Sequence, residues 1–352
     1  MKTVITFLSV IIAIAIITNS CKKNDKSSPA KKKPYAWIAG NTDSTGYGMI
    51  LFSSDSGNTW TRQGLNSQLL FGVSVTDIWA VDEQNVWAVG SNNTILTTND
   101  GGATWDKIQS PVDNENIEFM SIAIINKTNI WLSGSNGVVI NSADNGTTWK
   151  LFDTTFFHKG GMQGNFAISP ERVYVVGGYG NGNEKGFIGY TLDGGTTWDS
   201  VYPADNYNKN EWIGVTSSDN TIVVYGGKSH YMVSFDNGAT WNNDSIAAGG
   251  GGGGADINHL IMLDSKTWWG AMDMGHICFT TNGGSTWILQ QTDQGGEFLL
   301  GIDSWDNKLA LSVGELAGYP PTGAILKTTN GGNTWHTVDT VKTQLFHVTF
   351  IK

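Results

Sequence analysis

The stretch TTNDGGATW, residues 97–105, carries the pattern that decides the fold. Its last eight residues follow the phrase S/T-x-D/N-x-G-x-T-W, which the chain repeats seven times at intervals of 43 to 49 residues. A phrase this long at a nearly fixed period is typical of a repeat architecture. The acidic or amide positions and the closing tryptophans of the seven copies are Asp55, Asp100, Asp144, Asp193, Asp236, Asn282 and Asn330, with Trp60, Trp105, Trp149, Trp198, Trp241, Trp287 and Trp335.

Each residue type in the phrase has a physical role in a tight turn. The Asp or Asn oxygen can accept from backbone N–H groups two residues on, and Gly supplies a positive φ. Thr and Trp favour the start of a strand, where Trp can bury a large apolar surface. We therefore predict that each phrase is a hairpin turn and that its Asp or Asn is structural rather than catalytic.

Each period contains the same succession of short apolar runs. Residues 77–110 give DIWAVD, NVWAVGS and TILTTND before the phrase and TWDKIQS after it. Runs rich in Val, Ile and Trp and separated by Gly, Asn and Asp indicate four antiparallel strands in each period. Seven such sheets predict an all-β fold, a seven-bladed β-propeller of four-stranded antiparallel blades, with a linear β-solenoid as the alternative.

The two ends of the repeat region indicate a closed ring. Only two strands, at 36–41 and 48–53, precede the first phrase, so the first strand of that blade is missing. After the last blade the chain adds LFHVTFIK, residues 345–352, which reads as a first strand with nothing after it. We predict that this C-terminal strand completes the N-terminal blade, which removes an exposed sheet edge.

The N-terminus has the form of an export signal. Lys2 precedes the apolar run 4–17, which is too short for an ordinary spanning helix. Cys21 follows the small or polar residues 18–20, so residues 1–20 resemble a bacterial lipoprotein signal, although Thr18 stands where that family usually has Leu. The expectation is a lipid on Cys21, a lysine-rich tether over 21–34, a propeller over 35–352 and attachment to the outer membrane; a plain signal peptide is the alternative.

Charge excludes one class of partner. The chain has 21 Lys and Arg and 31 Asp and Glu; without Lys2, Asp25 and the six tether lysines, 14 positive and 30 negative residues remain, a net charge of −16. An acidic surface repels phosphate backbones. We therefore expect no nucleic acid partner and no membrane contact beyond the lipid anchor, for a protein that is a monomer.

The repeated phrase resembles the Asp-box, or BNR repeat, of certain propellers. Families that carry it include sialidases, xyloglucan-cleaving glycosidases, sortilin-type receptors and the photosystem II stability and assembly factors. The resemblance covers nearly all of residues 35–352, and the count of seven, the wording TTNDGG and the length of a single ring are most similar to the assembly factors. The Asp-box specifies the fold strongly and the function hardly at all.

What the resemblance implies about chemistry can be compared with the residues present. Sialidases hold a carboxylate with three Arg, whereas this chain has two, Arg62 and Arg172, so we exclude sialidase activity. Xyloglucan-type enzymes place a carboxylate pair in a cleft between two propellers, and one ring offers no such cleft. The assembly factors are described as binding their client through an Arg patch, which this chain lacks, so the client cannot be carried over.

Other motifs predict no cofactor, metal or catalytic site. The glycine run 249–254 lacks the Gly-Lys-Ser/Thr ending of a phosphate-binding loop and reads as a flexible loop. His276 and Cys278 alternate along a strand, but two ligands do not make a metal site. With Cys21 lipidated, Cys278 has no partner for a disulfide.

Candidate binding residues lie in the connections opposite the Asp-box turns. Those connections differ in length and chemistry between blades, and aromatic and polar groups on one open face are typical of recognition surfaces. Phe119 and His158 lie in this set of loops, and the candidate binding residues are Tyr179, Tyr207, Trp212, His230, Asp273, His276, Glu315 and Tyr319. The expected function is a non-catalytic binding or scaffold protein of the cell envelope with a protein or glycan partner. The alternative is a glycoside hydrolase or lyase that uses carboxylates on this face.

Overall fold

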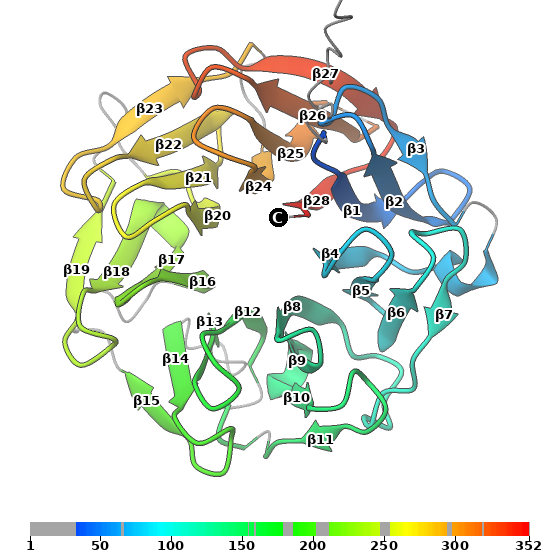
Figure 1. The fold of residues 1–352 in the computed structure, drawn as a ribbon, viewed down its shortest axis with the longest axis vertical. Coiled ribbons are helices and arrows are strands. Elements are labelled where there is room, and N and C mark those ends of the chain that lie inside the picture. The colour runs from blue at the N-terminus through cyan, green and yellow to red at the C-terminus, as the bar shows by residue number, and fades with distance from the viewer. Residues whose placement is uncertain are drawn as a thin grey trace, which may run out of the picture. The chain divides into compact units, whose positions relative to one another are not determined.

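Seven four-stranded antiparallel sheets stand around a common axis in a computed structural model of the protein (Figure 1). The structure describes residues 33–64, 67–153, 155–157, 160–178, 186–201, 211–246, 254–293, 298–318 and 320–351. The signal, Cys21 and nearly all of the tether lie outside the described residues. The predicted seven-bladed propeller is confirmed.

The strands of each blade follow one another from the axis outward. Blade 1 contains β28 (Leu345–Phe350), β1 (Ala36–Thr42), β2 (Gly48–Ser53) and β3 (Thr61–Arg62). Blade 2 contains β4 (Val75–Ala80), β5 (Val86–Gly90), β6 (Thr94–Thr98) and β7 (Asp106–Lys107). Blade 3 contains β8 (Phe119–Ile125), β9 (Asn129–Gly134), β10 (Val139–Ser142) and β11 (Lys150–Leu151). Blade 4 contains β12 (Met162–Ala167), β13 (Val173–Gly178), β14 (Gly186–Thr191) and β15 (Asp199–Val201).

The remaining three blades have the same order. Blade 5 contains β16 (Trp212–Ser218), β17 (Thr221–Gly226), β18 (His230–Ser234) and β19 (Asn242–Ser245). Blade 6 contains β20 (Ile257–Met262), β21 (Trp268–Met272), β22 (His276–Thr280) and β23 (Ile288–Gln291). Blade 7 contains β24 (Phe298–Ser304), β25 (Ala310–Leu316), β26 (Thr322–Thr328) and β27 (His336–Val341). Three short 3-10 turns, η1 (Gln68–Leu70), η2 (Ser135–Gly137) and η3 (Gly227–Ser229), lie in connections.

The C-terminal strand closes the ring as predicted. β28 pairs with β1 in antiparallel register from Ala36↔Phe350 to Gly40↔Leu345. Figure 1 shows this junction where the red β28 lies beside the blue β1. The first blade therefore combines strands from both ends of the chain.

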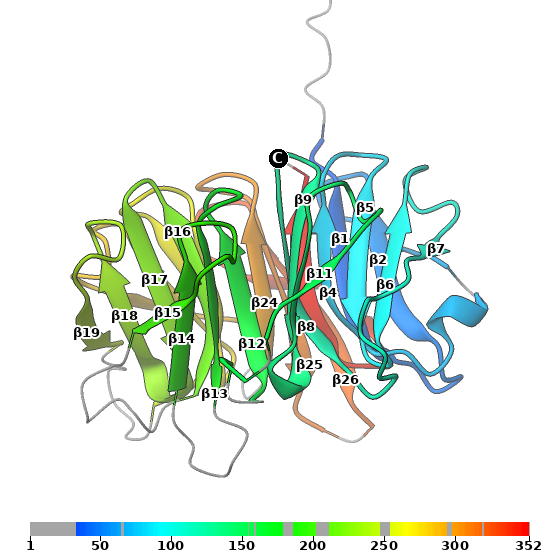
Figure 2. The ribbon, with the colours of Figure 1, turned by 90° about the horizontal axis from the view of Figure 1, so that it is seen from below.

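The ring has two faces with different connections (Figure 2). Each innermost strand runs from one face to the other, and the strands of a blade alternate in direction. The Asp-box turns, between third and fourth strands, share one face with the turns between first and second strands; we call it the box face. The connections between blades and between second and third strands lie on the other, the loop face.

The Asp-box turns are held by hydrogen bonds that run further along the chain than predicted. In the second copy, Oδ1 of Asp100 accepts from the backbone N–H of Thr104, four residues on rather than two, at 2.9 Å. Its Oδ2 accepts from the Thr104 hydroxyl at 2.6 Å, and the Thr98 hydroxyl donates to Oδ1 at 2.8 Å. These bonds lower the pKa of Asp100 to about 2. The fourth strand begins one residue after the Trp, at Asp106 in this blade.

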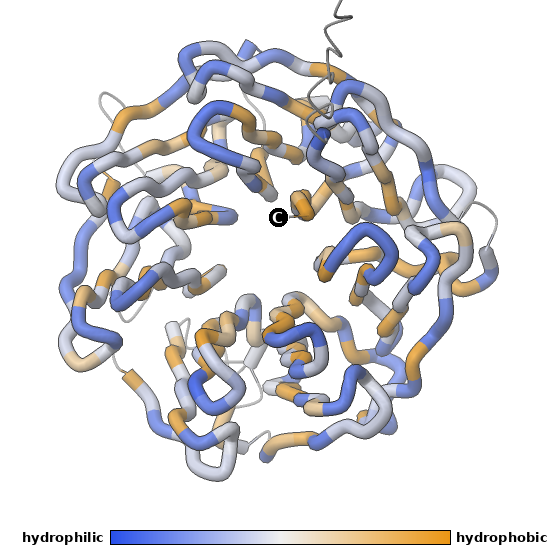
Figure 3. Tube along the Cα trace, in the orientation of Figure 1, coloured by the Kyte–Doolittle hydropathy of each residue, from blue (hydrophilic) through white to orange (hydrophobic). Residues whose placement is uncertain are grey.

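The core lies between neighbouring blades and uses the Asp-box residues. Gly102 has φ +87°, and a Cβ on it would lie 2.7 Å from the ring of Trp37 in the preceding blade. The same Trp37 ring packs edge-on against Trp105, with centroids 6.0 Å apart. Figure 3 shows hydrophobic residues along the strands and hydrophilic residues at many of the turns. Each box turn is therefore also an interblade contact.

Candidate functional site

A central channel of about 670 Å³ is lined by residues from all seven innermost strands. Each of these strands carries a β-bulge near its loop-face end, which re-aims the side chain that follows it. The residues at this shared position are Asp77, Ser121, Gly164, Gly214, His259, Gly301 and His347. Polar and charged side chains therefore line one side of the channel, and elsewhere the glycines at this position leave the channel without a side chain.

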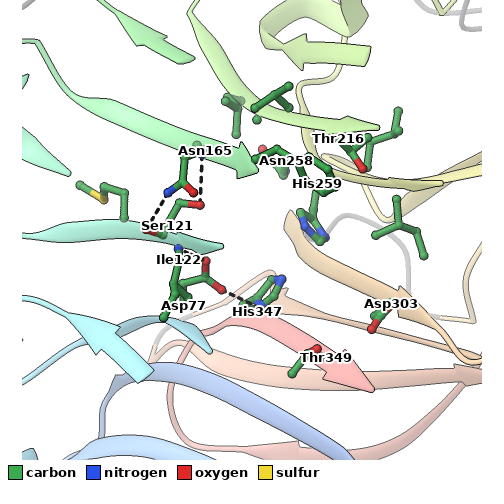
Figure 4. Close-up of a pocket in the computed structure, with 18 of the residues that line it drawn as sticks. Asp77, Ser121, Ile122, Asn165, Thr216, Asn258, His259, Asp303, His347 and Thr349 are labelled. Carbon is green, nitrogen blue, oxygen red and sulfur yellow. Dashed lines mark hydrogen bonds and ion pairs between the residues drawn. The ribbon is translucent and has the colours of Figure 1, made fainter. Parts of the chain in front are cut away.

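Asp77 and His347 form an ion pair inside the channel (Figure 4). Nδ1 of His347 lies 2.7 Å from Oδ1 of Asp77. The other carboxylate oxygen accepts the backbone N–H of Ile122 at 2.9 Å. Burial alone would lower the pKa of His347, but the charge and hydrogen bond of Asp77 outweigh it and raise this pKa above its usual value.

His259 lies beside this pair. Its ring stands nearly perpendicular to that of His347, with centroids 4.8 Å apart. Burial, and next the charge of His347, lower the pKa of His259 to about 4. Nδ1 of His259 lies 2.9 Å from the carbonyl oxygen of Ile302. The pKa values of the two channel imidazoles are therefore shifted in opposite directions, upward for His347 and downward for His259.

The polar residues of the channel connect neighbouring blades. Asp77 joins blades 2 and 3 through Ile122, and Oδ2 of Asp303 accepts the N–H of Phe350 at 2.8 Å, which joins blades 7 and 1. Oγ of Ser121 accepts the N–H of Asn165 at 3.2 Å, which joins blades 3 and 4. Because Asp77 and Asp303 are used in this way, they hold the ring together and are not a free carboxylate pair.

Five acidic residues lie on the loop face near the ends of innermost and second strands, and one of them, Glu118, lines the channel. Glu118, Glu211 and Asp256 immediately precede the innermost strands β8, β16 and β20, while Asp273 follows β21 and Glu315 lies near the end of β25. Amide side chains hold three of these carboxylates: Gln163 donates to Glu211 at 3.1 Å, Asn258 to Asp273 at 2.8 Å, and Gln344 to Glu315 at 2.7 Å. We call these five acidic residues the rim.

A partly apolar ring lies just inside the rim. The second or third residues of four innermost strands line the channel there and are partly exposed: Met120, Ile213, Leu300 and Phe346. We call these four the collar. Unlike the Asp-box turns, the rim and collar do not repeat from blade to blade, so this mouth offers a distinctive surface.

Four of the sequence-predicted residues lie on the loop face. Asp273 and Glu315 belong to the rim, and His230 and His276 begin the third strands of blades 5 and 6, where both are partly buried. Burial raises the pKa of Asp273. The remaining loop residues Tyr179, Tyr207, Tyr319 and His158 lie outside the described residues.

Trp212 is not a surface anchor, and the prediction that placed it on the binding face is wrong. Its side chain is 0% exposed and packs in the core between β13, β17 and β18. Phe119 is likewise 0% exposed. Both are first residues of innermost strands, where the side chain points between blades, and the two residues that follow each of them line the channel. The first residue of the innermost strand is apolar in every period, and this pattern could have indicated that Trp212 and Phe119 are buried.

The two arginines and the cysteine singled out in the sequence do not line the channel. Arg62 pairs with Asp43 in blade 1, whereas Arg172 lies at the box face of blade 4 and contacts Tyr174. Cys278 is buried, which raises the pKa of its thiol to about 12. Among the described residues, no three His, Cys, Asp or Glu side chains lie where they could share a metal ion. Within the same ranges no helix has the length and apolar character to cross a membrane.

The seven Asp-box turns, the four-stranded blades and the closing strand define an Asp-box seven-bladed propeller. Residues 67–202 match the family model described as photosynthesis system II assembly factor YCF48. The resemblance to the photosystem II assembly factors predicted from the sequence is therefore confirmed. No curated protein matches the sequence.

Solved structures show the same fold at low sequence identity. A structure titled YCF48 bound to D1 peptide is 19% identical with a TM-score of 0.57, over 75% of this chain and 80% of that one. YCF48 from Cyanidioschyzon merolae is 16% identical with a TM-score of 0.60, over 85% and 97%. A GH74 xyloglucanase from Xanthomonas campestris is 14% identical with a TM-score of 0.60, over 87% of this chain and 56% of that enzyme. At these identities the likeness concerns the fold alone.

Proposed function

We propose that this protein is a non-catalytic binding propeller that holds a polypeptide partner against its loop face and assists the assembly of an envelope or membrane complex. The observation that carries the proposal is the channel mouth, where the rim and collar differ from blade to blade and are exposed enough to contact a partner. Specificity requires such differences.

The box face is less suited to recognition. The Asp-box carboxylates are already used by hydrogen bonds within their own turns, as for Asp100 with Thr104 and Asp193 with Thr197. These turns repeat with little change around the ring. A partner on this face would therefore meet nearly the same chemistry at each blade.

A polypeptide is favoured over a glycan by the relatives. The matched family comprises assembly factors, and one solved YCF48 is titled as bound to a D1 peptide. The rival, a glycoside hydrolase, gains no support from the channel, because Asp77 and Asp303 serve interblade contacts. Release of reducing sugars from envelope polysaccharide by the purified protein would favour the rival.

The proposed envelope location rests on the signal-like N-terminus and Cys21. Replacing Cys21 with Ser should release soluble protein that carries no lipid label. Replacing Ser20 with Ala, which keeps the cysteine and a small residue before it, is the matched control and should leave the protein in the membrane fraction. A lipid-labelled, membrane-bound Cys21→Ser protein would contradict the lipoprotein proposal.

The binding face is tested by two exposed aromatic residues at opposite ends of one strand. Phe298 begins β24 at the loop face and is 53% exposed, and Trp305 follows the same strand at the box face and is 39% exposed. We expect Phe298→Arg to reduce recovery of the native partner on affinity purification from envelope by more than tenfold, and Trp305→Arg to leave it unchanged. The opposite result would place the partner on the box face.

A further inference from the structure

The described chain enters the ring on the box face. The N–H of Ser56, in the first Asp-box turn, donates to the carbonyl oxygen of Pro34 at 3.1 Å. Ala36 then begins β1 opposite Phe350, the last residue of β28. In Figure 2 the C-terminus and the blue start of the described chain lie together at the upper face, which is the box face. Any segment that precedes residue 33 therefore leaves the ring from this face.

Contacts on both sides of this entry point fix its place. The N–H of Ile351 donates to the carbonyl oxygen of Tyr35 at 3.0 Å. Lys327 lies near Lys33: burial lowers the pKa of Lys327, and the charge of Lys33 lowers it further. The Nζ of Lys327 donates to Asn58 of the first Asp-box turn at 2.7 Å. Residues 33–35 therefore lie against the box turn of blade 1 and the end of β28.

The length of the tether limits how far a lipid on Cys21 can lie from the entry point. Lys33 stands twelve residues after Cys21, the residue proposed to carry the lipid. Whatever its conformation, a chain of this length spans at most about 40 Å. A flexible chain of the same length spans about 20 Å on average. With the lipid inserted, the bilayer surface therefore lies within about 40 Å of the entry point on the box face.

Turning the loop face toward the bilayer would use nearly all of that length. The innermost strands contain six or seven residues, so they are about 20 Å long, and the turns on both faces add to this height. Two strands, β2 and β3, lie between β1 and the outer edge of blade 1, a further width of about 10 Å. A tether that leaves at β1 would have to cross this width and pass along the side of the ring before its lipid reached the level of the loop face. With the box face toward the bilayer, no such extension is needed.

We propose that the lipid-anchored protein stands with its box face toward the bilayer, so that the loop face points away and receives a partner segment about 20 Å or more from the bilayer surface. This inference rests on the proposed function, because it uses the lipid on Cys21 and the polypeptide on the loop face. It also narrows the kind of partner. The bound segment extends well out of the membrane or belongs to a soluble protein, and it does not lie at the membrane surface.

Resonance energy transfer on the anchored protein tests this orientation. The chain from Cys21 onward, the form that export would leave, is coupled through Cys21 to a thiol-reactive lipid. Cys278 does not compete for the lipid, because it is buried and the pKa of its thiol is raised to about 12. A donor dye is placed through an unnatural amino acid at position 308, exposed in the box-face turn after β24, or at position 274, 58% exposed in the loop-face turn after β21. The protein is bound to phosphatidylcholine vesicles that carry the acceptor dye on a lipid headgroup.

Transfer from position 308 should be at least about twofold more efficient than transfer from position 274. Equal transfer from the two positions, or more from position 274, would overturn the proposal. A flexible Gly-Ser insertion of about 24 residues before Lys33 is the matched variant, because it lets either face reach the bilayer and should remove the difference. A difference that survives the insertion would contradict the inference, since the tether would then not set the orientation. A thermal melt of each labelled protein controls for folding.

The outcome also separates this inference from the proposed function. The lipid is attached chemically, so the transfer reports the orientation whether or not cells lipidate Cys21. If the Cys21→Ser protein stays in the membrane fraction with a lipid label while position 308 shows the greater transfer, the lipoprotein proposal fails and the geometry of the tether stands. If Phe298→Arg loses the native partner while position 274 shows equal or greater transfer, the loop face binds the partner but the inferred orientation is wrong.

Discussion

Replacing Trp212 with Ala distinguishes a core residue from a binding anchor. The indole is 0% exposed and packs among Tyr174, Val176 and Val224 from neighbouring strands. Its Nε1 has no hydrogen-bond partner in the described structure, so the substitution breaks no such bond. The cost is the lost transfer free energy plus that of the cavity, about 3–5 kcal/mol for a buried Trp.

Urea denaturation followed by far-UV circular dichroism measures this cost as a shift of the unfolding midpoint. Trp305→Ala is the matched control, because that indole is 39% exposed at the box face and its loss should cost less than about 1 kcal/mol. A Trp212→Ala protein whose free energy of unfolding stays within about 1 kcal/mol of the wild-type value, but which loses partner binding, would refute the assignment of Trp212 to the core.

Three further predictions follow from the ring and its turns. Gly134→Ala should lower the free energy of unfolding, measured by urea denaturation, by about 1–3 kcal/mol, because a Cβ there would lie 2.3 Å from the Glu118 carbonyl oxygen. Unchanged stability would show that this contact relaxes freely. Folding lowers the pKa of Asp100 from 3.8 to about 2, so the stability that the ionised carboxylate contributes is present above pH 3.8 and is lost as pH falls toward 2. The Asp100→Asn protein should therefore lose less stability than the wild type over this pH interval. Identical acid titrations of the two proteins would contradict the hydrogen bonds of the turn. Deleting residues 344–352 removes β28 and should produce aggregation on size-exclusion chromatography, whereas a monomer with the wild-type melting temperature would contradict ring closure.

The fold was predictable because its decisive residues recur. The Asp-box phrase appears in every blade, and the unmatched strands at the two ends of the chain specify the closure between β1 and β28. Residue type did not predict how many residues separate each Asp-box oxygen from the N–H group that donates to it. A carboxylate such as Asp100 can serve a donor two or four residues away, and only the turn geometry selects Thr104.

The channel was harder to predict because its residues are distant in sequence. Asp77, His259 and His347 meet only because a ring of seven blades brings their strands to one axis. The bulge that turns these side chains inward is a backbone irregularity with no fixed residue type, since Gly and Ser also occupy it. An alignment of the seven periods would have shown the position but not its contacts.

Which candidate loop residues face solvent was hard to predict for a related reason. A loop-face position can point to solvent, to the channel or between blades, and adjacent residues of an innermost strand differ in this respect. Asp273 and Glu315 are partly exposed on the loop face, whereas Trp212 is buried in the core. Aromatic character alone did not separate an exposed anchor from a packing residue.

The central claim, that the loop face holds a polypeptide, is tested most directly by photo-crosslinking in the native envelope. A benzophenone amino acid is placed at position 298 on the loop face or at position 305 on the box face, two exposed positions that flank one strand. The loop-face protein should give a discrete adduct in which mass spectrometry locates the crosslink in a polypeptide, and the box-face protein should not. Adducts formed from position 305 and absent from position 298 would contradict the claim.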